Sequence, residues 1–167
     1  NSVSTSNVTS KSVTLTVSAT AGSNSIATYY YSSNNGTSYV SSNSNTYTFT
    51  GLSAGTTYNF RVYVVDSGGV KSNEATTSAT TTYRNPTANS VSVTSVTSNS
   101  ITVNVSASGG TNSVRTYYYS INNGAYVSST SNSYTFEGLN ASTTYSIRVY
   151  VADTAGKTSN TVSTTGT

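Results

Sequence analysis

A stretch of twenty residues occurs twice in the chain and constrains its fold more than any other feature. Residues 47–66 read YTFTGLSAGTTYNFRVYVVD and residues 134–153 read YTFEGLNASTTYSIRVYVAD, with fourteen of the twenty positions identical. Side chains alternate between the two faces of a β-strand, so one face of the first copy carries Tyr58, Phe60, Val62 and Val64. The Gly-Leu pair ahead of this strand indicates a tight corner, so each copy predicts a short strand, a corner and a long strand.

The repeat extends over almost the whole chain of 167 residues. Val13 matches Ile101 at an offset of 88, whereas Tyr58 matches Tyr145 at an offset of 87, so one residue is lost after the Asn123-Gly124 pair. A period near 88 residues with about seven short strands in each copy predicts two β-sandwiches in tandem. A copy of this length is small but sufficient for one hydrophobic core.

The segments between the repeated stretches also have strand and hairpin patterns. Residues 12–19, SVTLTVSA, alternate between apolar and hydroxyl side chains, as does a strand with one face in the core. Residues 26–33, IATYYYSS, run into Asn34-Asn35-Gly36. Asn-Gly favours a type I′ hairpin turn, in which both central residues need a positive φ. The fold class that these patterns predict is all-β.

Each copy resembles a fibronectin type III domain of the kind found in bacterial secreted proteins. The resemblance rests on SVTLTVSA, TYYYSSNNG and GLSAGTTYNFRVYVVD in the first copy, and on SITVNVSA, TYYYSINNG and GLNASTTYSIRVYVAD in the second. It implies two tandem seven-stranded immunoglobulin-like β-sandwiches. We expect a first domain over residues 1–82, a short linker over 83–88 that Pro86 restrains, and a second domain over 89–167.

The resemblance also implies roles for particular residues. Tyr58 and Tyr145 stand at the family's tyrosine corner, where the hydroxyl bonds to the upstream backbone. The family's usual core Trp and corner Pro are replaced here by Val17, Val105, Ala54 and Ala141. The glycine that follows the corner Pro is kept as Gly55 in the first copy and replaced by Ser142 in the second. We expect Tyr29 and Tyr31 to fill the volume of the missing Trp.

The chain offers little material for catalysis, a cofactor or a metal site. It has no His and no Cys, and its four acids are Asp66, Glu74, Glu137 and Asp153. Asp66 and Asp153 occupy the same turn in the two copies, where a carboxylate typically bonds nearby backbone N–H groups. A calcium site usually needs more than one carboxylate among its oxygen ligands, and these acids are scattered. We therefore expect no enzyme activity, no cofactor and no bound metal.

Charge and hydropathy exclude further classes of partner. The net charge is +3 and the basic residues are spread along the chain, whereas nucleic-acid binders cluster them on one face. No apolar run approaches the length of a membrane span. About two residues in five are Ser or Thr, a composition that favours a secreted or cell-surface protein. The chain begins at Asn1 rather than Met, so we expect a processed product or part of a longer protein.

Aromatic residues provide the one candidate binding surface. If the core face of the long strand is assigned correctly, the opposite face in the two copies carries Tyr30, Arg61, Tyr63, Tyr118, Arg148 and Tyr150. Such a face could stack on a sugar ring or on a partner protein. A simpler interpretation is that cross-strand aromatic pairs stabilise the sheet.

Three hypotheses for function follow. The first is a non-catalytic structural or spacer module of a secreted or cell-surface bacterial protein, with neighbouring domains as its partners. The second is an adhesion or binding module whose Tyr-Arg faces take carbohydrate or a host protein. The third is a subunit of an extracellular filament or phage virion, with identical subunits as partners.

Overall fold

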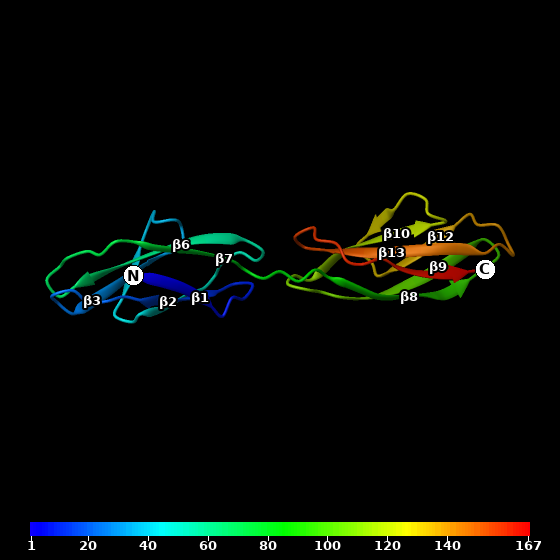
Figure 1. Cartoon of the computed structure of the whole chain (residues 1–167). Coiled ribbons are helices and arrows are strands. Elements are labelled where there is room, and N and C mark those ends of the chain that lie inside the picture. Colours follow the sequence, from blue (N-terminus) through cyan, green and yellow to red (C-terminus); the bar gives the residue numbers. More distant parts are fainter. The chain divides into compact units, whose positions relative to one another are not determined.

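The computed structural model describes residues 1–167, which form fourteen strands and no helix. The chain divides into two compact units, Asn1–Tyr83 and Arg84–Thr167, and Figure 1 colours them from blue to green and from green to red. The first unit contains β1 (Ser2–Ser6), β2 (Val13–Ser18), β3 (Ile26–Ser32), β4 (Val40–Ser42), β5 (Thr46–Phe49), β6 (Thr57–Asp66) and β7 (Ala75–Thr80). The second contains β8 (Thr87–Val96), β9 (Ser100–Ser108), β10 (Val114–Ile121), β11 (Val127–Ser129), β12 (Ser133–Glu137), β13 (Tyr145–Asp153) and β14 (Val162–Gly166).

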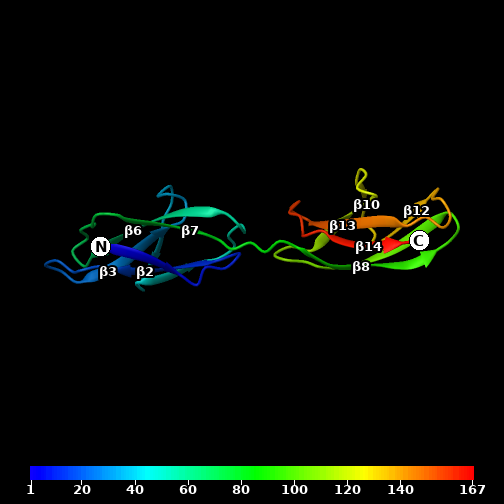
Figure 2. The same ribbon diagram turned by 45° about the vertical axis from the view of Figure 1, so that its right-hand side comes forward.

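Each unit is a sandwich of two antiparallel sheets. In the first unit the strand orders are β1-β2-β5 and β4-β3-β6-β7, and in the second they are β8-β9-β12 and β11-β10-β13-β14. Figure 2 shows β8 and β13 of the second unit in separate layers. The units divide between Tyr83 and Arg84, inside the segment predicted as a linker, and β8 begins at Thr87. The prediction of two tandem seven-stranded sandwiches is confirmed.

The core of each unit lies between its two sheets and follows the predicted alternation. In the first unit the buried residues are Val13, Leu15, Val17, Tyr31, Phe60, Val62 and Val64. In the second they are Val91, Ile101, Val103, Val105, Tyr119, Phe136, Ile147, Val149 and Val151. Burial of each of these aliphatic or aromatic side chains contributes about 1.5–3 kcal/mol. This apolar layer holds the outward-facing residues of β3 and β6 in register.

One tyrosine in each core has a fully buried ring and a hydroxyl that reaches a backbone carbonyl. Tyr31 stacks on Tyr47 with ring centroids 5.2 Å apart and donates to the carbonyl of Ser44 at 2.8 Å. Tyr119 makes the same bond to the carbonyl of Ser131 at 2.8 Å. Burial raises the pKa of Tyr31 to about 12. These rings supply the aromatic volume at the centre of the core, whereas Tyr29 is only half-buried.

Threonine pairs join neighbouring strands in this hydroxyl-rich, charge-poor chain. Thr14 and Thr48 are joined by their hydroxyls at 2.9 Å, and so are Thr102 and Thr135 at the matching place in the second unit. Such cross-strand pairs stabilise a sheet by about 0.2–1 kcal/mol each. Only two ion pairs form, and both involve Glu74. The side chains of neighbouring strands are thus joined mainly by neutral hydrogen bonds.

The two Asn-rich hairpins differ in the position of their turn. In the first unit Asn35 and Gly36 have positive φ, as the predicted turn requires. In the second unit Asn122 and Asn123 have positive φ instead, and the N–H of Gly124 donates to the carbonyl of Ile121 at 2.9 Å. The missing residue is therefore absorbed at the start of the turn, so its predicted place after Asn123-Gly124 was wrong.

Candidate functional site

The two predicted tyrosines of the first unit, Tyr30 and Tyr63, form a cluster with a third, Tyr39, and all three are half-buried. Tyr30 on β3 lies directly opposite Tyr63 on β6, and their rings stack with centroids 4.6 Å apart and an interplanar angle of 9°. The ring of Tyr39 meets Tyr63 edge-on, with centroids 4.9 Å apart. Lys71 places its Nζ 3.9 Å from the centroid of Tyr63. Much of the Tyr63 ring is therefore already in contact with the protein's own side chains.

Glu74 lies beside this cluster and binds three of its neighbours. Its carboxylate accepts from Lys71 Nζ at 3.2 Å, from Arg61 Nη1 at 3.2 Å and from the Tyr39 hydroxyl at 3.0 Å. These hydrogen bonds lower the pKa of Glu74, and the bond from Lys71 has the largest effect. Burial, followed by the bond to Glu74, raises the pKa of Tyr39.

The sequence interpretation missed Tyr39, Lys71 and Glu74 as neighbours of Tyr63. A signal for the tyrosine existed, because Tyr39 has its counterpart in Tyr126 just after the hairpin in the second copy.

The second unit keeps the three tyrosines and the arginine but lacks equivalents of Lys71 and Glu74. Tyr118 stacks on Tyr150 with centroids 4.6 Å apart, and Tyr126 meets Tyr150 edge-on at 4.8 Å. Threonines, Thr158 and Thr161, stand at the positions equivalent to Lys71 and Glu74. Burial, and then the neighbouring tyrosines, raise the pKa of Tyr150. Exposed Arg148 donates to the side-chain carbonyl of Asn123 at 3.0 Å and forms no ion pair.

Two shallow hollows adjoin residues of the predicted binding faces. A hollow of about 400 Å³ in the second unit is lined by Tyr118 together with Arg115, Asp153 and hydroxyl residues of β11 such as Ser129. A hollow of about 360 Å³ in the first unit is lined by Arg61 among Asn and Thr side chains. The hollow in the second unit thus combines an aromatic residue with Arg115 and several hydroxyl groups, which can hydrogen-bond a hydroxyl-rich ligand.

The two corner tyrosines hydrogen-bond to the backbone upstream of their strands. The N–H of Ser53 donates to the hydroxyl of Tyr58 at 2.9 Å. The N–H of Asn140 donates to the hydroxyl of Tyr145 at 2.9 Å. Each bond fixes the corner between the Gly-Leu pair and the long strand that follows.

Two of the acids are engaged in turns. Asp66 accepts from the N–H groups of Gly68 at 2.9 Å and Val70 at 2.8 Å, and the bond from Val70 is the main cause of its lowered pKa. Asp153 accepts from the N–H groups of Ala155 and Lys157, each at 2.9 Å. No three His, Cys, Asp or Glu side chains come together in a way that could hold a metal ion. The structure contains no helix that is long and apolar enough to cross a membrane.

Comparison with protein families agrees with this double architecture. The model of the fibronectin type III domain matches residues 1–81 and, separately, residues 84–166. The chain belongs to the fibronectin type III family. No curated protein sequence matches it.

Three solved structures are similar to the tandem of fibronectin type III domains. A two-domain fibronectin type III segment of chicken tenascin is 19% identical and has a TM-score of 0.44, with 98% of this chain and 96% of that chain covered. The fibronectin(III)-like modules of Clostridium thermocellum CbhA are 18% identical with a TM-score of 0.38, and 96% and 92% are covered. The central fibronectin-III array of RIM-binding protein is 19% identical with a TM-score of 0.38, and 98% and 65% are covered.

The residues that lead out of the first fibronectin type III domain are bonded to that domain. Thr81 is buried, and its hydroxyl donates to the carbonyl of Ser53 at 2.6 Å and accepts from the N–H of Thr56 at 3.0 Å. The N–H of the next residue, Thr82, donates to the carbonyl of Thr9 at 3.0 Å.

The residues that lead into the second fibronectin type III domain are bonded to it in turn. The N–H of Arg84 donates to the hydroxyl of Thr111 at 2.7 Å, and its carbonyl accepts from the N–H of Thr111 at 2.8 Å. Pro86 is buried. Gly110 lies so close to the Arg84 and Asn85 carbonyls that a Cβ there would collide with both.

Proposed function

We propose that the chain is a non-catalytic spacer within a larger secreted or cell-surface bacterial protein, where it joins neighbouring domains. One observation carries this proposal. The segment between the domains is bonded to the first domain through Thr81 and Thr82 and to the second through Arg84. Because residues on both sides of the junction are hydrogen-bonded to a domain, few residues remain free to act as a flexible linker. A short, restrained linker suits a spacer.

The hydrogen bonds of three of the four acids also support a structural role. Asp66 and Asp153 hold turns, and Glu74 binds Lys71, Arg61 and Tyr39 on the surface of one sheet. General acid–base catalysis needs a titratable side chain within reach of a substrate proton. These carboxylates are instead committed to hydrogen bonds within the protein. The family consists of domains that commonly serve as structural or binding modules of larger proteins.

The spacer proposal is tested by the width of the distance distribution between the two domains. The two substitutions Ser41→Cys and Ser128→Cys introduce one thiol at an exposed position of β4 and one at an exposed position of β11. Because the chain has no other Cys, nitroxide labels attach at these two positions alone. We expect a narrow distribution by pulsed electron spin resonance. A flexible Gly-Ser insertion between Tyr83 and Arg84 serves as the control and should broaden it. An equally broad distribution in the chain without the insertion would contradict the proposal.

A second candidate function, ligand binding, is favoured by the hollow beside Tyr118. There Tyr118 lies among Arg115 and the hydroxyl groups of Ser128, Ser129 and Thr130, a combination that suits carbohydrate or a partner protein surface. If a glycan or host-protein array gives a ligand, Tyr118→Ala should abolish its binding, whereas the matched variant Tyr30→Ala in the first domain should retain it. Loss of binding in Tyr30→Ala alone would place the ligand elsewhere.

A further inference from the structure

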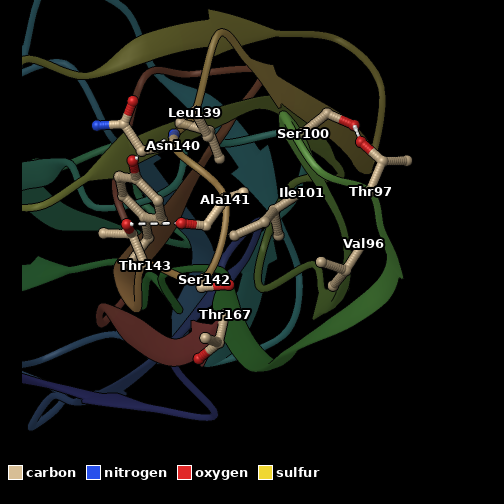
Figure 3. A pocket seen from close by; sticks show the side chains of 11 residues that line it. Val96, Thr97, Ser100, Ile101, Leu139, Asn140, Ala141, Ser142, Thr143 and Thr167 are labelled. Carbon is tan, nitrogen blue, oxygen red and sulfur yellow. Dashed lines mark hydrogen bonds between the residues drawn. The ribbon is translucent and has the colours of Figure 1, made fainter.

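The second domain has a pocket at the end where β14 finishes. It encloses about 240 Å³, and its lining includes Val96, Ile101, Leu139, Asn140, Thr143 and Thr167. In Figure 3 the loop of residues 139–143 lies opposite Val96 and Ile101, with Thr167 next to Ser142. Apolar side chains of β8 and β9 thus face a loop that contributes apolar, amide and hydroxyl side chains.

The first domain shows what occupies the same place there. Thr57 and Thr80 are joined by their hydroxyls at 2.8 Å, and Thr144 and Thr167 are joined in the same way at 2.9 Å. Thr167 is therefore the structural equivalent of Thr80. The residues that follow Thr80 turn onto the end of their own domain as the segment 81–83.

The contacts of that segment translate onto residues of the pocket. Thr81 bonds to Ser53 and Thr56, and the sequence positions equivalent to these are Asn140 and Thr143. Thr82 bonds to the carbonyl of Thr9, whose equivalent is Thr97. Asn140, Thr143 and Thr97 all line the pocket. The second domain thus has residues equivalent to those that bind segment 81–83 in the first domain.

The third residue of the segment has a place as well. The ring of Tyr83 lies beside Gly55, where a Cβ would be 3.4–3.7 Å from the tyrosine side chain, which is ordinary van der Waals contact. Ser142 stands at the equivalent position and carries such a Cβ. The Cβ of Ser142 therefore leaves room for an aromatic ring at the place that Tyr83 occupies in the first domain.

We propose that this pocket is the docking site for an extended peptide segment that continues β14, with Thr at its first position and an aromatic residue at its third. The first Thr hydroxyl would donate to the carbonyl of Asn140 and accept from the N–H of Thr143. The second residue would donate its N–H to the carbonyl of Thr97. The inference rests on the proposed spacer function, since such a segment is the joint to a further domain.

The test adds Thr-Thr-Tyr-Arg, the sequence of residues 81–84, directly after Thr167 of the full chain. Amide hydrogen exchange of Thr143, followed by NMR, should slow by about tenfold relative to the chain without the addition, because its N–H gains a hydrogen bond. Thr56, whose N–H already has this bond, should be unchanged and reports that the protein is folded.

The matched control adds Val-Thr-Tyr-Arg, which keeps the shape of the first side chain and lacks its hydroxyl. We expect Thr143 to exchange in this chain as fast as in the chain without an addition. Unchanged exchange with Thr-Thr-Tyr-Arg, or equal slowing with both additions, would overturn the proposal. The spin-label experiment fails or succeeds independently, because it measures the joint between the existing domains rather than this pocket.

Discussion

Alanine at Gly110 and at its counterpart Gly22 should have opposite effects on stability, which tests how the second domain holds the segment that leads into it. Both glycines occupy the same position in their repeats. A Cβ at Gly22 meets nothing within 4 Å. A Cβ at Gly110 would be 2.6 Å from the carbonyl carbon of Arg84 and would collide with the carbonyl oxygens of Arg84 and Asn85.

The size of the effect follows from the bonds that the collision breaks. Displacing Arg84 removes its two hydrogen bonds with Thr111, and each is worth about 0.5–1.5 kcal/mol. Replacing Gly by Ala also restricts the unfolded chain, which stabilises a protein by about 0.4–1 kcal/mol where the backbone accepts Ala. This second effect is common to both variants. The difference in unfolding free energy between Gly22→Ala and Gly110→Ala is therefore about 1–3 kcal/mol.

Urea unfolding of both full-length variants, combined with hydrogen exchange resolved by peptide, assigns the change to one domain. We expect Gly22→Ala to be at least as stable as the original chain. In Gly110→Ala we expect a weaker second domain and faster exchange of the Thr111 amide. The reasoning is refuted if the two variants agree within about 0.5 kcal/mol while exchange at Thr111 stays unchanged.

Three further predictions concern single residues. Ser142→Gly should stabilise the second domain by about 0.5–1 kcal/mol in urea unfolding, because Ser142 has a φ of 53°, which disfavours side chains with a Cβ. Tyr31→Phe should reduce the loss of stability between pH 10 and 12. In that window the unfolded chain releases the phenol proton while folded Tyr31, with a pKa of about 12, retains it, so the unfolding free energy falls as pH rises; urea midpoints at pH 8 and pH 11 measure this, and an equal fall in both proteins would contradict it. Glu74→Gln should lower the pKa of Tyr39 in a spectroscopic titration, because the hydrogen bond to the Glu74 carboxylate is one cause that raises this pKa; an unchanged titration of Tyr39 would contradict it.

The fold was predictable because local pattern and tertiary structure agree in the long strands. Phe60, Val62 and Val64 alternate with polar or half-buried neighbours in the sequence and are buried in the structure. The twofold repeat then fixed the number of sandwiches. The sequence also predicted that Tyr31 fills the core, because its residue type and its place on the strand both favour burial.

Other features depend on register and on contacts between distant residues, which a sequence pattern does not encode. Lys71 reaches the ring of Tyr63 because the turn after β6 brings the chain back beside that strand. The shift of the hairpin turn to Asn122 follows from a one-residue deletion that sequence alignment alone placed too late. The fit of Gly110 under the carbonyl of Arg84 is a backbone contact, and Gly22 has the same residue type without it.

The neutral threonine pairs between strands have a consequence for the environments in which the protein can work. Hydroxyl-to-hydroxyl bonds such as Thr14–Thr48 carry no net charge, so dissolved salt does not screen them as it screens ion pairs. The chain also has no histidine, the side chain whose ordinary pKa makes proteins respond to pH between 5 and 8. The free energy of unfolding should therefore change little between low and high salt concentration, and little between mildly acidic and neutral pH.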